Sequence, residues 1–294
     1  MITTDSITDK FKRSWDITKQ TFHVMKADKE ILLFPLLSGI FSILLLLIFS
    51  FPIILMIIKD SAALNTVPIL GYIMLFAFYF IVIFFATFFN VGTVHIAKTR
   101  FEGGDATFKD GLNTAMKHIK HIIAWSVLAA TVGLILNVLQ SKTRQKGGIA
   151  GMLSSILISI VGFAWAIVSI FVVPAMVIKG QGPIEALKSS ALTVKKTWGE
   201  SLIRYYGLGL VQTLFTILGI FLFLIPGVIL IFSGFFFISL FFLGLFLLWL
   251  TLTMVVFSSA NTIFNTALFL YADKGEVTKY YTKETLSSAF RSTK

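Results

Sequence analysis

The sequence predicts an all-α, polytopic membrane protein whose six transmembrane helices form three tandem repeats of an amphipathic interfacial helix and a helical hairpin. Mean hydropathy is +0.89 and only 13% of the residues are charged, whereas a soluble domain carries about 25%. Several uncharged apolar stretches exceed the roughly 18 residues that mark a spanning helix. Basic residues also gather in alternate loops. This composition excludes an ordinary soluble enzyme, a disordered tail and a fibrous repeat.

Charged and polar segments separate the first four predicted spans, which are residues 31–58, 67–97, 122–140 and 149–178. Pro35 falls in the first turn of the first span, where a missing N–H has little effect, and Pro52 is expected to kink the far end of that span. The first 30 residues contain no apolar h-region. We therefore expect no cleaved signal peptide.

The last apolar stretch is the hardest to divide, because 68 consecutive residues, 205–272, carry no charge. The Pro-Gly pair at 226–227 favours a turn, which would end the fifth span at Phe223. The remaining residues, 228–271, would measure about 66 Å as one helix, roughly twice the bilayer core. They form either one long bent span or two spans. Two glycines are candidate bend points, Gly234 and Gly244.

The distribution of basic residues predicts the orientation. With six spans both termini lie on one side, and the segments on that side hold 21 of the 25 Lys and Arg residues. The positive-inside rule therefore places both termini in the cytoplasm, in a multi-pass protein of the inner membrane. A seventh span would move a strongly basic tail to the other side. We interpret the net charge of +11 as a sign of contact with anionic lipid rather than with nucleic acid.

Each predicted repeat begins with an amphipathic helix. The chain is read as one integral membrane domain, 1–294, whose parts are repeat one (about 6–97), repeat two (about 105–178), repeat three (about 182–272) and a cytoplasmic tail (273–294).

The amphipathic helices are predicted to lie in the headgroup layer, with aromatic residues inserted and lysines in water. We expect Trp15, Phe108 and Trp198 to anchor them there. The alternative is that these helices are simple connectors. Their apolar faces comprise, in chain order, Ile7, Phe11, Trp15, Thr18, Phe22 and Met25; Phe108, Leu112, Met116 and Ile119; and Ile184, Leu187, Ala191, Val194 and Trp198.

Several segments resemble known families. Residues 11–15 (FKRSW), 29–35 (KEILLFP) and 267–272 (ALFLYA) together with 289–291 resemble an uncharacterised six-span membrane family of bacteria and archaea, a domain of unknown function. Residues 173–190 are similar, more distantly, to the membrane domains attached to some glycerophosphodiester phosphodiesterases. The resemblance implies a fold and little about activity. The soluble phosphodiesterase domain has no counterpart in this sequence.

Sequence motifs of enzymes are absent. The chain has no cysteine, which excludes disulfides and thiolate chemistry. It contains no P-loop, no His-Glu-x-x-His and no Gly-x-Ser-x-Gly motif. His118 and His121 can share a helix face, but two histidines make a poor metal site. No Asp or Glu lies inside a predicted span, which disfavours proton-coupled transport. We therefore predict no catalytic residue, no cofactor and no metal.

Polar residues within the spans are the main site candidates. With cytoplasmic termini they all fall near the inner leaflet, where they could line a polar cavity. The alternative is hydrogen bonding between helices, worth about 0.6 kcal/mol each. The candidates are Asn90, His95, Arg204, Gln212, Asn261 and Asn265.

Small residues recur every four positions at the start of the fourth span. Such spacing lets helix backbones approach closely. It favours packing inside the bundle, with a homodimer interface as the alternative. The residues are Gly147, Gly151, Ser155 and Ser159.

The function favoured by the sequence is that of a non-enzymatic protein that binds or organises membrane lipids, with anionic headgroups at the cytoplasmic face as partners. The basic amphipathic helices and the inner-leaflet polar residues support it. The alternative is a channel or facilitator for a small solute, which needs a polar path through both leaflets. A lipid-modifying enzyme is the third hypothesis. It would need a carboxylate at the interface.

Overall fold

The computed structural model describes residues 7–59, 69–145, 148–198 and 208–290, and within these ranges the chain is helical and has no strand. Six helical segments are long and apolar enough to cross a membrane. They confirm the predicted fold class, a helical multi-pass membrane protein. The six segments are Lys29–Phe51, Gly71–Phe101, Ile119–Thr143, Gly148–Lys179, Gly209–Phe232 and Phe236–Lys274.

The helical elements follow one another with short connections. In chain order they are α1 (Ile7–Ala27), the 3₁₀-helix η1 (Lys29–Leu32), α2 (Leu33–Lys59), α3 (Ile69–Phe101), α4 (Phe108–Lys117), α5 (Ile119–Gln145), α6 (Gly148–Ser169), α7 (Val172–Lys179), α8 (Pro183–Trp198), α9 (Gly209–Gly219), the π-helical segment η4 (Ile220–Leu224), α10 (Ile225–Phe232), α11 (Phe236–Lys274) and α12 (Lys283–Phe290).

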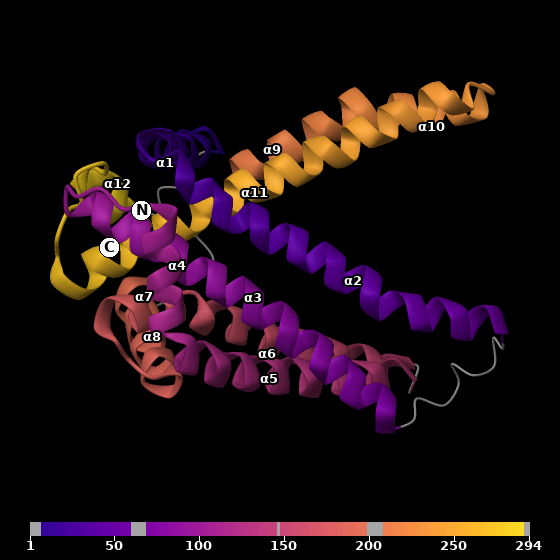
Figure 1. The fold of residues 1–294 in the computed structure, drawn as a ribbon, viewed down its shortest axis with the longest axis horizontal. Helices are drawn as coiled ribbons and strands as arrows, with labels where there is room; N and C mark the ends of the chain where they lie inside the picture. The colour runs from indigo at the N-terminus through magenta and orange to yellow at the C-terminus, as the bar shows by residue number, and fades with distance from the viewer. Residues whose placement is uncertain (1–6, 60–68, 146–147, 199–207, 291–294) are drawn as a thin grey trace.

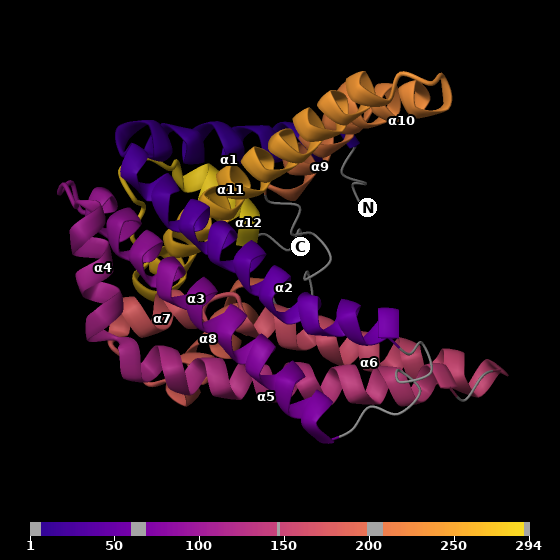
Figure 2. The same ribbon diagram turned by 45° about the vertical axis from the view of Figure 1, so that its right-hand side comes forward.

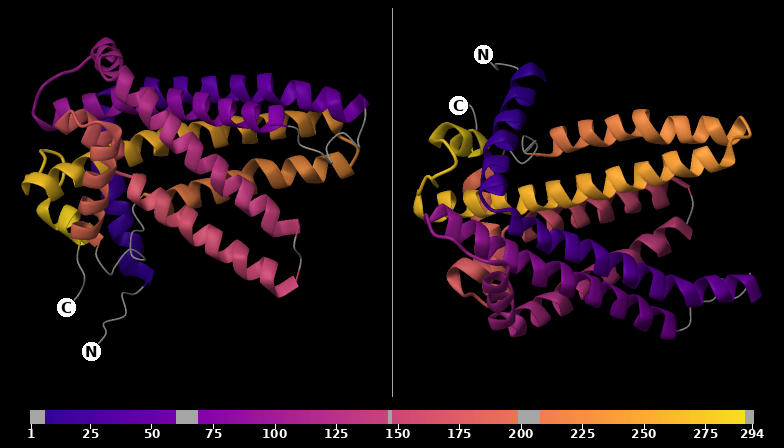
Figure 3. Two further views of the ribbon diagram at one scale, coloured as in Figure 1. Left: turned by 90° about the horizontal axis from the view of Figure 1, so that it is seen from below. Right: turned by 45° about the horizontal axis from the view of Figure 1, so that its top comes forward.

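The long helices form three hairpins that meet at one end and spread apart at the other (Figure 1). The hairpins are α2–α3, α5–α6 and the pair formed by α9–α10 with α11. The short helices α1, α4, α7, α8 and α12 gather where the hairpins meet (Figures 1 and 3). We call this end the base and the opposite ends the tips, which are separated in Figure 2. A short helix followed by two long helices occurs three times, but the origin of the three units from one repeat stays a prediction.

Burial is concentrated in the basal half of the molecule. The basal part of α11 is the central element and contacts α1, α2, α3, α7, α8, α9 and α12. Its residues Ile263, Phe264 and Ala267 are completely buried. At the tips, by contrast, Phe232 and Phe237 are 87% and 84% exposed. Such exposure suits contact with lipid chains, which are as apolar as these side chains.

The ring of Phe34 in α2 holds the basal parts of α2, α3 and α4 together. Phe34 is completely buried and packs against Phe108, with 4.7 Å between the ring centroids. A Cβ added at Gly92 of α3 would lie 2.2 Å from Phe34 Cε1, and one at Gly111 of α4 would lie 2.4 Å from Phe34 Cζ. Only glycine therefore leaves room for this ring between α3 and α4.

The structure corrects the predicted orientation of the amphipathic helices. Thr18 and Met25 of α1 and Val194 of α8 were assigned to a lipid-facing side, but they are buried against the bundle. Phe11 and Trp15 of α1 remain 42% and 49% exposed. The physical reason is that an apolar stripe is satisfied equally by a protein core or by lipid, so periodicity alone does not distinguish the two.

The predicted turn at 226–227 is also wrong. The fifth span continues through η4 into α10, and the chain reverses at Ser233–Phe235, where Gly234 has φ +83°. Pro226 is tolerated because it lies in the first turn of α10. Gly227 serves packing instead, since a Cβ there would lie 3.1 Å from Leu243 Cδ2 of α11. The sixth span is thus a single helix of 39 residues.

The ring of Phe34 generates a prediction about glycine. Gly92→Ala should lower the stability of the protein by about 1–3 kcal/mol, because the new methyl group overpacks a filled space. Gly39→Ala in α2 is the matched control, since a Cβ there meets nothing within 4 Å. Thermal unfolding in detergent micelles measures both changes. Adding Phe34→Leu to Gly92→Ala should restore part of the loss, and equal effects at the two glycines would contradict the packing account.

Candidate functional site

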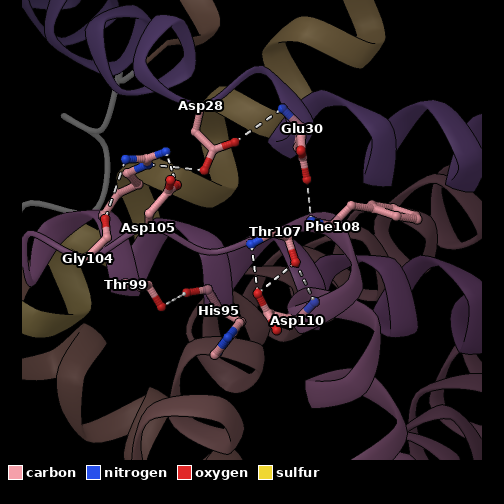
Figure 4. Close-up of polar contacts among 10 residues, drawn as sticks. Asp28, Glu30, His95, Thr99, Gly104, Asp105, Thr107, Phe108 and Asp110 are labelled. Carbon is pink, nitrogen blue, oxygen red and sulfur yellow. Dashed lines mark hydrogen bonds and ion pairs between the residues drawn. The ribbon is translucent and has the colours of Figure 1, made fainter.

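Polar contacts at the base join the α1–α2 hinge to the segment between α3 and α4 (Figure 4). Arg100, near the end of α3, donates from Nε to Asp28 Oδ2 over 3.1 Å and also pairs with Asp105. The side chain of Asp28 is 4% exposed and that of Asp105 is 81% exposed. Arg100 thus neutralises a carboxylate that is withdrawn from water, where an unpaired charge would be strongly destabilising.

Two carboxylates of the hinge cap helices. Asp28 Oδ1 accepts the backbone N–H of Glu30 over 3.2 Å at the start of η1. Glu30 in turn accepts the backbone N–H of Phe108, the first residue of α4. Negative groups at helix N-termini satisfy free N–H donors and interact favourably with the helix dipole. The N-terminal hinge therefore fixes where α4 begins.

A capping box completes the start of α4. Asp110 Oδ2 accepts from the amide of Thr107 over 2.9 Å and from its hydroxyl over 2.7 Å. Hydrogen bonds from the hydroxyl and the amide of Thr107 lower the pKa of the Asp110 carboxyl. The cap is therefore fully present at neutral pH and is lost as the pH falls through that lowered pKa. His95 of α3 lies near enough to Asp110 for their charges to interact (Figure 4).

The C-terminal segment closes the base from the other side. The hydroxyl of Tyr281 lies 2.8 Å from Thr21 Oγ1 of α1, and its ring packs against Phe101 of α3 and Phe264 of α11. Gln20 of α1 also donates to Thr285 Oγ1 of α12 over 2.9 Å. Helices from both ends of the described chain are thus joined by polar and aromatic contacts.

The residues predicted to line a cavity lie on three helices of the basal half. On α3, Asn90 and His95 are five residues apart and so point in different directions; His95 lies towards α4. Asn90 shares a helix face with Phe101, which packs against Tyr281. Asn90 Oδ1 is buried without a hydrogen-bond partner among the described residues. Half-buried residues of α9 and α11 make up the rest, Gln212, Asn261 and Asn265, and Arg204 lies outside the described residues.

The small residues of α6 face α5 in part. Gly151 is buried, and Ser155 Oγ accepts from Gln140 Nε2 of α5 over 2.6 Å. Ser159 is exposed and donates to the carbonyl of Ser155 within its own helix. Gly147 lies outside the described residues. The contact of Ser155 supports packing of α6 inside its own hairpin, and a dimer interface stays a prediction.

The predicted anchors differ in their surroundings. Trp15 is exposed and stacks on Phe11, with 6.3 Å between the ring centroids. Phe108 is half-buried against Phe34 and so belongs to the bundle. Trp198 is the last residue of α8. Within the described ranges, no group of three or more His, Asp or Glu side chains is placed to hold a metal ion.

The polar contacts of the base were not predicted from the sequence. The Thr-x-x-Asp spacing of Thr107 and Asp110 is a local signature of a capping box and could have been recognised. The pair of Arg100 and Asp28 joins residues that are 72 positions apart, and no local pattern marks it.

Comparison with known proteins gives a family without an assigned activity. The sequence model of a family of unknown function (DUF6159) matches residues 69–279, most of the chain. This agrees with the expected resemblance to an uncharacterised membrane family. No curated protein matches the chain. The more distant resemblance to membrane domains of phosphodiesterases stays a prediction.

The two carboxylates that contact Arg100 should differ in importance. Asp28→Asn should lower stability by about 1–3 kcal/mol, because it leaves the guanidinium without its buried partner while asparagine can still cap η1. Asp105→Asn, the matched control, should change stability by less than about 0.5 kcal/mol, as exposed pairs contribute little. Thermal unfolding in micelles tests this. A larger effect of Asp105→Asn would show that the exposed pair is the important one.

Proposed function

We propose that this chain, which belongs to the family of unknown function DUF6159, is a non-enzymatic membrane protein that binds anionic phospholipids at its base. The observation that carries the proposal is that α1, α4 and α8 each expose a strip that contains both apolar and lysine side chains. The strips are Phe11, Trp15, Lys19 and Lys26 on α1; Lys109, Met116 and Lys120 around α4; and Ile184, Lys188, Leu192 and Lys195 on α8.

The strip on α8 shows the pattern most clearly. Ile184 and Leu192 are 61% and 67% exposed, and Lys188 lies between them on the same helix face. On α4, Met116 is 58% exposed. Isolated apolar residues of this size on a surface need no explanation. Their repetition beside lysines on three helices at one end of the spans favours the headgroup layer, where chains of lipid and anionic phosphates are both present.

Electrostatics supports the same partner. Each lysine near an anionic membrane surface contributes about 1 kcal/mol of attraction. The buried faces of the same helices hold them on the bundle, so the strips are positioned before any lipid binds. Binding therefore needs little ordering of the protein, which reduces its entropic cost.

The proposal includes an orientation with the base at the cytoplasmic side of the inner membrane. It rests on the excess of basic residues in the segments that form the base and on the anionic lipid of the cytoplasmic leaflet.

Anionic lipid should stabilise the protein through the strips. Phosphatidylglycerol added to the delipidated protein in non-ionic micelles should raise its Tm more than phosphatidylcholine does, because only the former adds net negative charge. Lys188→Gln with Lys195→Gln should reduce that difference by at least half. Lys142→Gln with Arg144→Gln, near the other end of α5, is the charge-matched control. Equal shifts with both lipids would refute the proposal, and lipid-independent solute flux in proteoliposomes would favour a channel.

The orientation has its own test, since the chain contains no natural cysteine. Ser233→Cys, at the exposed tip between α10 and α11, should react with a membrane-impermeant thiol reagent added to intact cells. Ser287→Cys, in α12 at the base, should react only after the membrane is permeabilised. The reverse pattern would place the base outside.

A further inference from the structure

We infer that the basal end of the α5–α6 hairpin is a binding site for the phosphate group of a phospholipid, an inference that rests on the proposed function and gives it a specific location. We call the site the α5–α6 slot. Its residues are Lys117, His121, Trp125, Trp165 and Ser169.

Two stacked indoles lie at the end of the α5–α6 slot that is further from the base. The rings of Trp125 on α5 and Trp165 on α6 have centroids 5.8 Å apart and an interplanar angle of 17°. The two helices run in opposite directions, as Figure 1 shows. One helical turn towards the base therefore leads from Trp125 to His121 and from Trp165 to Ser169. His121 and Ser169 thus lie at the same level, above the indoles, on the faces where the helices meet.

Both of these residues carry a buried polar atom without a partner. His121 Nδ1 and Ser169 Oγ have no hydrogen bond among the described residues. Other hydroxyls of this hairpin donate to their own helix, such as that of Ser126 to the carbonyl of Ile122 over 2.7 Å. An unsatisfied buried donor or acceptor costs about 1–3 kcal/mol, so its occurrence on both sides of one contact calls for an explanation.

A break in the fourth span makes Ser169 available. The predicted single helix 149–178 is interrupted after Ser169, and α7 begins at Val172. Ser190 of α8 serves the freed backbone, because its hydroxyl accepts from the amide of Phe171 and donates to the carbonyl of Val168. The amide of Phe171 and the carbonyl of Val168 therefore need no hydrogen bond from the hydroxyl of Ser169.

The chemistry of the pair directs a donor outward. If the hydroxyl of Ser169 rotates to donate to His121 Nδ1, the N–H donor of the ring is Nε2. Nε2 then donates towards the base. Lys117, the exposed last residue of α4, precedes His121 by four positions across the bend at His118, where α4 ends. An imidazole N–H beside an ammonium group suits a phosphate oxygen.

Apolar neighbours favour a phospholipid over a free anion. Met116 and Ile123, on either side of the donors along the chain, are 58% and 42% exposed. They lie where the amphipathic α4 meets the membrane-spanning α5. A phosphate that carries acyl chains can contact both the donors and this apolar surface, whereas inorganic phosphate would contact only the donors.

The test measures how much phosphatidylglycerol gives half of the maximal Tm shift of the delipidated protein in micelles. His121→Phe keeps a ring but removes both nitrogens, and should raise this concentration at least tenfold. His121→Gln keeps an N–H donor near the position of Nε2 and should stay within threefold of the wild type. His118→Phe is the matched control, because His118 Nδ1 already pairs with the Thr114 carbonyl at 2.9 Å, and it should also stay within threefold.

The outcomes separate this inference from the proposed function. If His121→Phe binds phosphatidylglycerol like the wild type while the lysine variants of α8 do not, the slot is refuted and the general function stands. If His121→Gln is as weak as His121→Phe, a purely structural role of the ring replaces the inference. If inorganic phosphate stabilises the wild type through His121 and phosphatidylglycerol gives no shift, the ligand is a soluble anion, which overturns the lipid assignment in both proposals.

Discussion

The arrangement of the base depends on how closely α3 and α4 approach each other around Phe34. The ring fills the space left by Gly92 and Gly111, and the residues that precede it in the chain form the hinge to α1. Because the ring is fixed, the carboxylates of the hinge come within reach of Arg100 and of the first turn of α4. One steric fit thus helps to place a charge pair and two helix caps.

Polar and apolar interactions are divided between the two ends of the molecule. The base contains the capped helices, the Arg100 pair and the contacts of Tyr281, and the tips expose phenylalanine and leucine side chains. Such a division suits a protein whose spans hold the short helices at one membrane surface. In the proposed function, the exposed lysine strips and the α5–α6 slot share one level of the bilayer, which is the level of phosphate groups.

Much of the fold could be predicted from the sequence, because long uncharged stretches have few structures available to them in a bilayer. The six spans follow from that constraint, and the helices at residues 7–27, 108–117 and 183–198 follow from periodicity. The turn after the fifth span was predicted in the wrong place because a Pro-Gly pair is typical of turns. In the structure, Pro226 and Gly227 follow the π-helical segment within the span, and Gly227 packs against Leu243. The lysines of the proposed site could be identified from the sequence. The position of His121 relative to Ser169 could not, because it depends on the register of α5 against α6.

The contact between Thr21 and Tyr281 joins positions separated by 260 residues. The ribosome makes Thr21 long before Tyr281. During synthesis, α1 is therefore present before the C-terminal segment that it contacts. In that interval the three hairpins can enter the membrane one after another. Closure of the base by Tyr281 consequently follows the synthesis of all three hairpins.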